Sequence, residues 1–301
     1  MPVERLVLAA RAKINLALDV LFKRPDGYHE VAMVMQSLAL ADKVTLTADR
    51  ALSVVSTAPD LECGPSNLAY RAAALLRERC GVDRGVRIAL EKNIPLAAGL
   101  AGGSADAAAV LRGLNRLWGL GLTLSELEGV GAALGSDVPF CLRGGTVLAT
   151  GRGEALRSLP ALPHAWIVLA KPPVAVSTAW VYGNYRGERV TLRPDVAGME
   201  SCLAAGDLNG VTARLANVLE TVTVPAHPAV AALKAAMLEH GARASLMSGS
   251  GPTVFGIADN LRQAEKIAAA LRSSTDAWVT VTETAGELEG EDGTTVAADQ
   301  A

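Results

Sequence analysis

Apolar and polar residues alternate through much of the first part of the chain, and a period of two is typical of half-buried β-strands. The alternation is clearest over 13–21, and apolar runs of strand character lie at 5–10, 43–47 and 52–55. The segment 24–27 (Arg-Pro-Asp-Gly) contains the residues that favour a turn. The pattern therefore predicts several strands before the first helix.

Helical patterns begin in the second quarter of the chain. The first is expected to start at Ser66 or Asn67, both of which can cap a helix, and to stop at Gly81. A strand predicted over 86–90 then leads into a segment rich in glycine and alanine. A longer helix is predicted directly after that segment, at about 104–118.

A further helix is predicted from Thr123 and Glu126, which have the spacing of a capping box, and it should end near Gly135. The order so far is several strands, a helix, a strand, a loop and more helices. A doubly wound parallel sheet would instead alternate strand and helix regularly. We therefore predict an α+β fold.

The second half of the chain mixes strands and helices again, which indicates a second domain. The patterns predict three strands, at 166–170, 253–257 and 277–282, and helical runs at 199–219, 227–240 and 260–273. We place the domains at 1–160 and 161–285. The remaining segment, 286–301, is small, polar and acidic, and we expect a disordered tail there because it has little apolar surface to bury.

Composition narrows the function classes. The 301 residues carry 28 Lys and Arg against 31 Asp and Glu, and aromatic residues make up 4%. This balance gives no basic footprint for nucleic acid and few rings for base stacking. The four cysteines lack metal-site spacing, and no apolar run approaches the ~20 residues that span a bilayer. We expect a cytoplasmic protein, monomer or homodimer, whose partner is a small molecule and neither nucleic acid nor membrane.

The segment 95–106 (PLAAGLAGGSAD) has the character of a phosphate-binding loop. Its small side chains leave backbone N–H groups uncovered, and the helix that follows directs the positive end of its dipole at the loop. The spacing is neither that of a P-loop nor that of a dinucleotide-binding loop. Tight helix packing is the alternative explanation for so many small residues.

Two charged residues interrupt apolar surroundings. Lys13 lies within the alternating strand, and Asp137 lies between Ser136 and an apolar run. Taken singly, Lys13 could be an edge lysine that reaches water, and Asp137 could be a cap or turn residue beside a helix. Together they could serve phosphoryl transfer, because an aspartate can accept a hydroxyl proton while a lysine keeps it charged and offsets developing charge.

Two other segments are candidates for binding. Tyr28 and His29 follow the predicted turn and could hold a flat heterocycle, although an ordinary hairpin would explain them as well. The segment 248–253 (SGSGPT) is a second glycine turn that could line the same cleft or could simply connect two strands. The other histidines are scattered, so we predict no metal site built from them.

Three segments, in this order, resemble the motifs of the GHMP small-molecule kinases. They are AKINL at 12–16, the glycine loop at 95–106 and SGSGPT at 248–253. Within this superfamily the chain is similar to the kinases of 4-diphosphocytidyl-2-C-methyl-D-erythritol. That likeness rests on KRPDGYHE at 23–30 and is supported by GSDVPF at 135–140 and VST at 176–178.

The resemblance implies an N-terminal α+β kinase domain, a ferredoxin-like C-terminal domain and an active site between them. The implied reaction is ATP- and Mg²⁺-dependent phosphorylation of the 2-hydroxyl of that substrate, in the non-mevalonate isoprenoid pathway. Lys13 and Asp137 would be the catalytic pair. The implied substrate contacts are Asn15, Tyr28, His29, Asp137 and Thr178. The implied ATP contacts are Asn67, Pro95, Leu96, Ala97, Ala98, Gly99, Leu100, Ala101, Gly102, Gly103, Ser104, Ala105 and Asp106.

The glycine loop departs from the usual family pattern at four positions. Ala97, Ala98 and Ala101 stand where glycines are common, and Ala105 stands where a serine is common. Because alanine disfavours positive φ, we expect ordinary backbone angles at the first three. The missing hydroxyl at Ala105 removes one possible Mg²⁺ ligand, so we expect the phosphates and water to hold this ion and assign it no side chain.

Two alternatives remain open. Another GHMP kinase could act on a sugar, homoserine or a mevalonate-like acid, but those substrates offer no flat ring for Tyr28 and His29. A nucleotide-binding protein without activity could use the same scaffold, but the presence of both Lys13 and Asp137 favours an enzyme.

Overall fold

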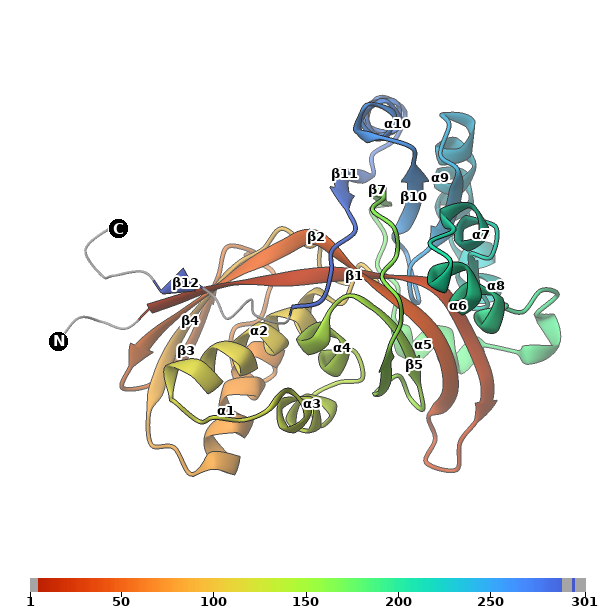
Figure 1. Cartoon of the computed structure of the whole chain (residues 1–301). Helices are drawn as coiled ribbons and strands as arrows, with labels where there is room; N and C mark the ends of the chain where they lie inside the picture. The colour runs from red at the N-terminus through yellow and green to blue at the C-terminus, as the bar shows by residue number, and fades with distance from the viewer. Residues whose placement is uncertain (1–4, 289–293, 296–301) are drawn as a thin grey trace.

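The structure is a computed structural model of the chain and describes residues 5–288 and 294–295. Within this part of the chain the strands form an eight-stranded and a four-stranded sheet (Figure 1). The first sheet is built around two long antiparallel strands, β1 (Arg5–Lys23) and β2 (His29–Asp49). Its other strands are β3 (Leu52–Ser56), β4 (Gly85–Glu91), β5 (Thr146–Thr150), β6 (Ala155–Ser158), β8 (Ala216–Asn217) and β12 (Thr294–Thr295).

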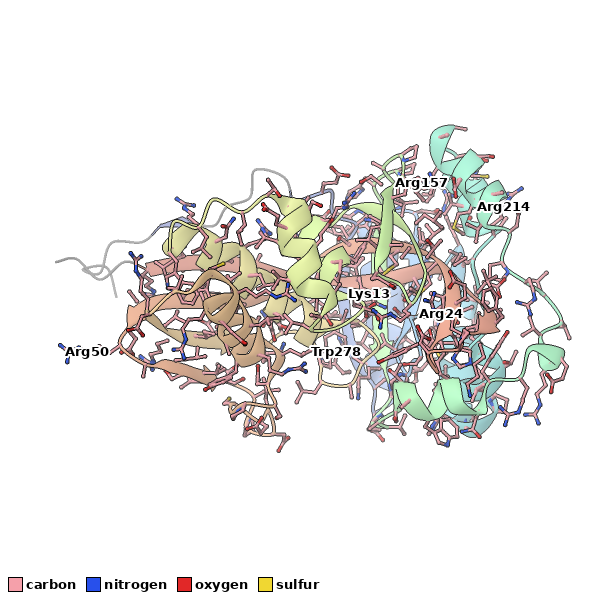
Figure 2. All side chains as sticks on the ribbon, turned by 90° about the horizontal axis from the view of Figure 1, so that it is seen from below. Lys13, Arg24, Arg50, Arg157, Arg214 and Trp278 are labelled. Atoms are coloured by element: carbon pink, nitrogen blue, oxygen red, sulfur yellow. The ribbon has the colours of Figure 1, made fainter. Side chains whose placement is uncertain are left out.

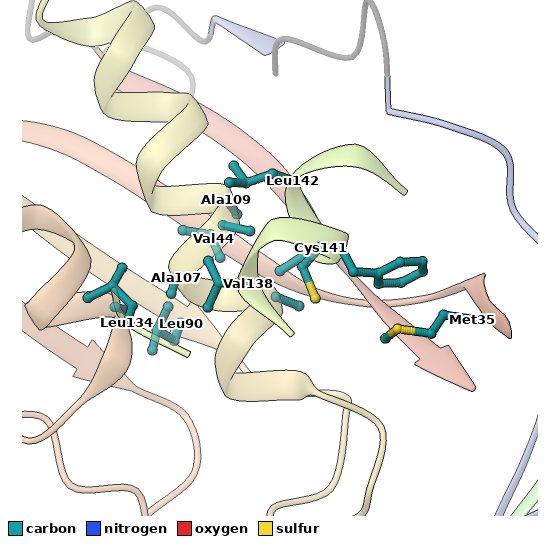
Figure 3. Close-up of a cluster of buried hydrophobic side chains, with 14 of the residues drawn as sticks. Met35, Val44, Leu90, Ala107, Ala109, Leu134, Val138, Cys141 and Leu142 are labelled. Carbon is teal, nitrogen blue, oxygen red and sulfur yellow. The ribbon is translucent and has the colours of Figure 1, made fainter. Parts of the chain in front are cut away.

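Four helices cover one face of the first sheet (Figure 1). They are α1 (Leu68–Cys80), α2 (Gly102–Leu117), α3 (Leu124–Ala132) and α4 (Val138–Arg143). Small side chains of α2, such as Ala107 and Ala109, lie beside Val138 and Leu142 of α4 in the buried core (Figure 3). Alanines allow these helices to approach each other and the sheet closely, which fixes the start of α2 relative to β1.

The second sheet is antiparallel, with strand order β11-β7-β10-β9. Its strands are β7 (Trp166–Lys171), β9 (Ala244–Met247), β10 (Val254–Ala258) and β11 (Trp278–Glu283). Helix α9 (Pro228–Glu239) precedes β9, and α10 (Leu261–Ser274) lies between β10 and β11. This is the βαββαβ order of a ferredoxin-like unit. Five short helices lie between β7 and α9 in the chain: α5 (Thr178–Asn184), a 3₁₀ turn (Gly187–Arg189), α6 (Val196–Ala204), α7 (Leu208–Thr212) and α8 (Glu220–Ala226).

The structure confirms the predicted α+β class and several local signals. Asn67 caps α1 by accepting a hydrogen bond from the Ala69 amide, and Gly81 ends this helix in the left-handed conformation. Thr123 and Glu126 form the predicted capping box. Local side-chain chemistry therefore sets these helix ends, as the sequence indicated.

Several predicted strands and helices have different bounds. The runs at 5–10 and 13–21 are one continuous strand, β1, and β2 begins at His29, well before the predicted strand at 43–47. Register shifts in the β1–β2 pairing interrupt the simple alternation on which the prediction relied. The helical run at 199–219 is also divided, because Gly206 has a φ of +65° and Asp207 caps the separate helix α7.

The chain passes from the first sheet to the second between β6 and β7, near the predicted boundary at 160, but β8 returns to pair with β1. The predicted tail begins at 286, yet Leu288 is buried, Glu287 pairs with Gly144, and Thr294–Thr295 pair with β1 as β12. Residues 286–288 and 294–295 therefore do not fit the prediction of disorder. Residues 289–293 and 296–301 lie outside the described part of the chain. None of the helices described is both long and apolar enough to cross a bilayer.

Candidate active site

A cavity of about 1340 Å³ brings together residues from distant parts of the chain. Its walls come from β1 and β2, the loop before α2, the start of α4, helix α5 and the turn after β9. Figure 2 shows Lys13 near the middle of the molecule, between a part that includes Arg50 and a part that includes Arg214. The cavity thus lies where elements of both sheets meet, as expected for a ligand site between two domains.

Lys13 and Asp137 face each other in this cavity. The Nζ atom of Lys13 is 3.7 Å from Oδ2 of Asp137 and donates a 2.7 Å hydrogen bond to Oδ1 of Asn15. The lysine side chain is 5% exposed, whereas that of Asp137 is 33% exposed. A buried cation therefore lies beside a carboxylate that an incoming molecule can still reach.

The position of Asp137 explains why its carboxylate is available. Asp137 occupies the N-cap position of α4, but its side chain makes no capping hydrogen bond. Asp137 thus flanks the helix in a turn, as the alternative interpretation expected, but its side chain does not cap α4. Asp137 and Tyr182 both line the cavity, and burial and the nearby Asp137 raise the pKa of the Tyr182 hydroxyl above its ordinary value.

The glycine loop lies against Lys13. The backbone N–H of Lys13 donates to the carbonyl oxygen of Leu100 at 3.1 Å, which ties β1 to the loop. Helix α2 then begins at Gly102, and its N-cap residue, Ala101, makes no side-chain cap. The first N–H groups of a helix have no acceptor within it, so the start of α2 offers donors and a positive dipole end to an anion.

Two alanines of the loop overturn the expectation of ordinary backbone angles. Ala97 has a φ of +50° and Ala101 has a φ of +58°, whereas Ala98 is not left-handed. The loop must turn tightly between β4 and α2, and these two residues make that turn at a cost of about 1–2 kcal/mol each. The family's glycines would adopt the same angles without this cost.

This conformation predicts opposite effects for two similar substitutions. Ala101→Gly should raise the free energy of unfolding by about 0.5–1 kcal/mol, because relief of the left-handed strain exceeds the entropy cost of glycine. Ala98→Gly should lower it by about 1 kcal/mol, since that residue has no such strain and its methyl group is buried. Urea denaturation of both variants tests this, and stabilisation by both or by neither would contradict it.

A buried charge cluster holds the two ends of the loop. Lys92 forms ion pairs with Asp42 and, at 2.6 Å, with Asp106 in the first turns of α2. Asp42 also accepts hydrogen bonds from the N–H groups of Asn93 and Ile94, where the chain enters the loop. Burial raises the pKa of Asp106, Lys92 opposes this effect and Asp42 adds to it. Asp106 therefore stabilises the conformation of the loop and does not line the cavity.

The second glycine turn packs directly on the first. The Ser248 hydroxyl donates to the carbonyl oxygen of Gly99 at 3.0 Å. A Cβ atom added to Gly99 would lie 2.5 Å from the Ser248 carbonyl oxygen, and Gly99 also has a φ of +72°. Only glycine suits Gly99 for both reasons. The two turns, far apart in the sequence, thus form one wall of the cavity.

Aromatic rings gather at the other end of the cavity. The His29 ring lies 5.4 Å from that of Tyr182 and 6.4 Å from that of Tyr185, measured between ring centres. Tyr28 is exposed in the cavity, and the guanidinium of Arg152 lies 5.0 Å from the centre of its ring. Burial, and then the charge of Lys23, lower the pKa of His29, which favours the neutral ring. This end suits a flat, uncharged heterocycle.

Most of the residues predicted for the site line this one cavity. They are Lys13, Asn15, Tyr28, His29, Pro95, Leu96, Ala97, Ala98, Gly99, Ala101, Gly102, Gly103, Ser104, Asp137 and Thr178. Four others do not line it: Leu100, Ala105 and Asp106 point into buried surroundings, and Asn67 caps α1. The Thr178 hydroxyl lies 2.9 Å from that of Ser250, at the second turn.

The sequence analysis missed part of the aromatic end. Tyr182 and Tyr185 line the cavity beside His29, and Arg152 and Lys92 also reach it. The available signal was the spacing of Thr178, Tyr182 and Tyr185, which suits one face of a helix that starts at the predicted substrate residue. No helix was predicted over 178–184, so that spacing was not used.

Comparison with known proteins agrees with the geometry. The family model for the GHMP kinases N terminal domain matches residues 67–145, and that for GHMP kinases C terminal matches 199–276. A solved structure of 4-(cytidine 5'-diphospho)-2C-methyl-D-erythritol kinase is similar, with a TM-score of 0.79 and 38% identity over 93% of this chain and all of that one. Homoserine kinase from Cytophaga hutchinsonii shares the fold, with a TM-score of 0.77 at 20% identity over 97% of each chain.

Curated relatives are more similar still in sequence. The 4-diphosphocytidyl-2-C-methyl-D-erythritol kinase of Geobacillus kaustophilus is 52% identical over 90% of this chain and 94% of its own. That of Bacillus cytotoxicus is 54% identical over 84% of this chain and 88% of its own. The chain is thus a member of the GHMP kinases. Within them it belongs to the 4-diphosphocytidyl-2-C-methyl-D-erythritol kinase family.

Proposed function

We propose that this protein transfers the γ-phosphoryl group of ATP to the 2-hydroxyl of 4-diphosphocytidyl-2-C-methyl-D-erythritol. The observation that carries the proposal is the Lys13–Asp137 pair, which lies in a cavity between a phosphate-binding loop and a group of aromatic rings. Phosphoryl transfer depends mainly on positioning and charge stabilisation, and this arrangement offers both. Family membership supports the same reaction.

ATP would bind with its phosphates at the start of α2. The donors would be backbone N–H groups of the loop, from Leu96 through Ser104, because Pro95 has no N–H, and the helix dipole would favour the negative charge. Leu100, Ala105 and Asp106 would act by shaping the loop, since their side chains lie outside the cavity. Asn67 would contribute through the start of α1 at the adenine side.

Asp137 and Lys13 would have different roles in the reaction. Asp137 would accept the proton of the attacking hydroxyl, since its carboxylate has no capping bond and is open to the cavity. Lys13 would hold that carboxylate and offset the negative charge of the transferred group. Asn15 would fix the lysine through the 2.7 Å hydrogen bond to its Nζ.

The cytosine ring of the acceptor would occupy the aromatic end. Tyr28 and Tyr182 would supply stacking faces, and His29 would supply a ring nitrogen for a hydrogen bond. Thr178 would lie near the erythritol, beside the second glycine turn. A kinase of homoserine or mevalonate would have no use for this group of rings, so the geometry favours a nucleotide-linked alcohol.

Mg²⁺ would accompany ATP and reduce the repulsion between its phosphates and the attacking oxygen. Among the described residues no group of three or more His, Cys, Asp and Glu side chains could hold a metal ion. Asp137 and Ser104 are oxygen donors that line the cavity and suit a hard cation. The phosphates and water would supply most of the coordination.

The test is to measure ADP formation by the purified protein with ATP, Mg²⁺ and different alcohols. We expect turnover with the cytidylyl-linked substrate and at most a trace with methylerythritol phosphate, homoserine or mevalonate. Equal turnover of a linked and an unlinked alcohol would contradict the assigned substrate. Absence of ADP with every alcohol would contradict the proposed enzyme and favour a nucleotide-binding protein.

Loss of one stacking ring should weaken binding of the acceptor substrate but not binding of ATP. Tyr28→Leu should raise KM for the cytidylyl substrate by about 10- to 100-fold, because stacking a base on an aromatic ring contributes about 1–3 kcal/mol. KM for ATP should stay within about threefold of the wild-type value. Trp180→Leu is the matched control, since Trp180 is also an exposed aromatic residue near the site but does not line the cavity. An equal effect of both substitutions would contradict the role of Tyr28.

A further inference from the structure

Three polar side chains spaced three residues apart reach the second glycine turn from one side. Asn217 donates hydrogen bonds to the carbonyl oxygens of Met247 and Gly249, at 2.9 and 2.8 Å. Glu220 accepts a 2.9 Å hydrogen bond from the Met247 N–H. Thr223 donates a 3.0 Å hydrogen bond to the carbonyl oxygen of Ser250. This spacing matches one face of α8 and the residues just before it.

These bonds use nearly the whole polar capacity of the three side chains. The Asn217 carbonyl oxygen accepts from the Leu219 N–H at 2.9 Å, so both ends of this amide are engaged. Lys234 forms an ion pair with Glu220 at 2.6 Å and holds its carboxylate toward the turn. Thr223 is fully buried. Asn217 is buried as well, and Glu220 is half-buried. Polar groups that are satisfied and shielded in this way favour one geometry, because breaking a bond leaves an unpaired group.

The turn they hold is in contact with the proposed reacting groups. A Cβ atom added to Gly249 would lie 3.4 Å from the Lys13 Nζ, 3.5 Å from Oδ1 of Asn15 and 3.3 Å from the Gly99 carbonyl oxygen. Gly249 therefore packs against the lysine ammonium in the wall of the cavity. A small shift of this turn would free the lysine ammonium to move from the side of Asp137.

The opposite end of this segment is attached to the strand that carries the lysine. Strand β8 pairs in parallel with β1, where Ala17 and Leu18 are opposite Ala216 and Asn217. The Val218 N–H also donates to the Leu18 carbonyl oxygen at 3.0 Å. The segment 216–223 thus connects β1, a few residues beyond Lys13 and Asn15, to the turn that covers them.

We infer that Asn217, Glu220 and Thr223 are positioning residues for phosphoryl transfer. They hold the Gly249 backbone against Lys13, so that its ammonium stays between Asn15 and Asp137 while the phosphoryl group moves. The inference rests on the proposed function for its effect on turnover. That these side chains fix the turn follows from the hydrogen bonds and does not depend on the proposed function.

Thr223 offers the cleanest test, because two substitutions with similar side chains separate the effect of its shape from the effect of its hydrogen bond. Thr223→Val keeps the shape and removes the donor, whereas Thr223→Ser keeps the donor. We expect Thr223→Val to lower kcat by about 10- to 100-fold, the scale of a misplaced reacting group, with KM for both substrates within about threefold. Thr223→Ser should retain kcat within about threefold. The control is Thr221→Val, because the Thr221 hydroxyl donates to the carbonyl oxygen of Val218, in the turn just before α8, and not to the second glycine turn.

Thermal unfolding separates positioning from general damage. The inference is supported if kcat falls in Thr223→Val alone while all three variants melt within a few degrees of each other. It is overturned if Thr223→Val turns over like the wild type, if Thr223→Ser loses as much activity as Thr223→Val, or if Thr221→Val loses equally.

Hydrogen exchange of the backbone amides over 247–253, followed by mass spectrometry, tests whether the three side chains fix the turn and requires no turnover. We expect faster exchange there in Thr223→Val and no change in Thr221→Val; unchanged exchange in both would overturn it. Should the wild-type protein form no ADP, the proposed function fails, and this measurement still decides whether the three side chains hold the turn.

Discussion

Replacing Asp137 with asparagine should lower kcat by about 10²–10⁴-fold, which is the usual contribution of a positioned proton acceptor. The amide has nearly the same size as the carboxylate but cannot take the proton of the attacking hydroxyl. Asp137 makes no capping bond that the substitution would break, so α4 should form as before. ATP affinity should stay within about threefold, since the phosphates bind at the start of α2.

The measurement is steady-state turnover combined with titration of ATP binding by calorimetry. Asp259→Asn is the control, because Asp259 is an exposed aspartate that forms an ion pair with Arg243 far from the cavity lining. Full turnover by the Asp137 variant would remove this residue from its role. Loss of ATP binding together with turnover would indicate a structural role instead.

Replacing Lys13 should have a similar effect even when the positive charge is kept. Lys13→Met removes the charge, and Lys13→Arg substitutes a planar, forked cation for a compact one. Gly249, Asn15 and Asp137 surround the ammonium closely, so the guanidinium lacks room to keep the same contacts. We expect kcat to fall by about 10²–10³-fold in both variants, the loss seen when one preorganised charge-stabilising group is removed.

Lys43→Met provides the control for this pair of variants. Lys43 is an exposed lysine of the neighbouring strand β2 and forms an ion pair with Glu91 at 2.8 Å. Its replacement should leave kcat unchanged, because exposed ion pairs contribute little. If Lys13→Arg retained wild-type kcat, any nearby positive charge would suffice and the tight placement described above would be irrelevant to the reaction.

The sequence predicted those features that depend on local chemistry. Asn67, Gly81 and the Thr123–Glu126 box mark helix ends because a side chain or a backbone angle there satisfies groups of the same helix. The pairing of Lys13 with Asp137 was predicted from two charges in apolar surroundings and from family resemblance. The helix ends follow from residues typical of caps, whereas the Lys13–Asp137 pair is a tertiary contact that the family resemblance connected.

Other features set by tertiary contacts were not predicted. Ala97 and Ala101 are left-handed because the loop must fit between Lys13, the Lys92 cluster and the second glycine turn, which local propensity does not reveal. The extent of β2 depends on register shifts in its pairing with β1. Tyr182 lines the cavity beside His29, and this contact joins residues that lie far apart in the sequence.

The most direct test of the account is a crystal structure with a non-hydrolysable ATP analogue and the cytidylyl substrate bound together. The account predicts the triphosphate at the start of α2, the cytosine between Tyr28 and Tyr182, and the terminal phosphorus beside Lys13. The acceptor 2-hydroxyl should then lie within hydrogen-bonding distance of the Asp137 carboxylate. A complex in which the terminal phosphate lies away from both Lys13 and Asp137 would contradict it.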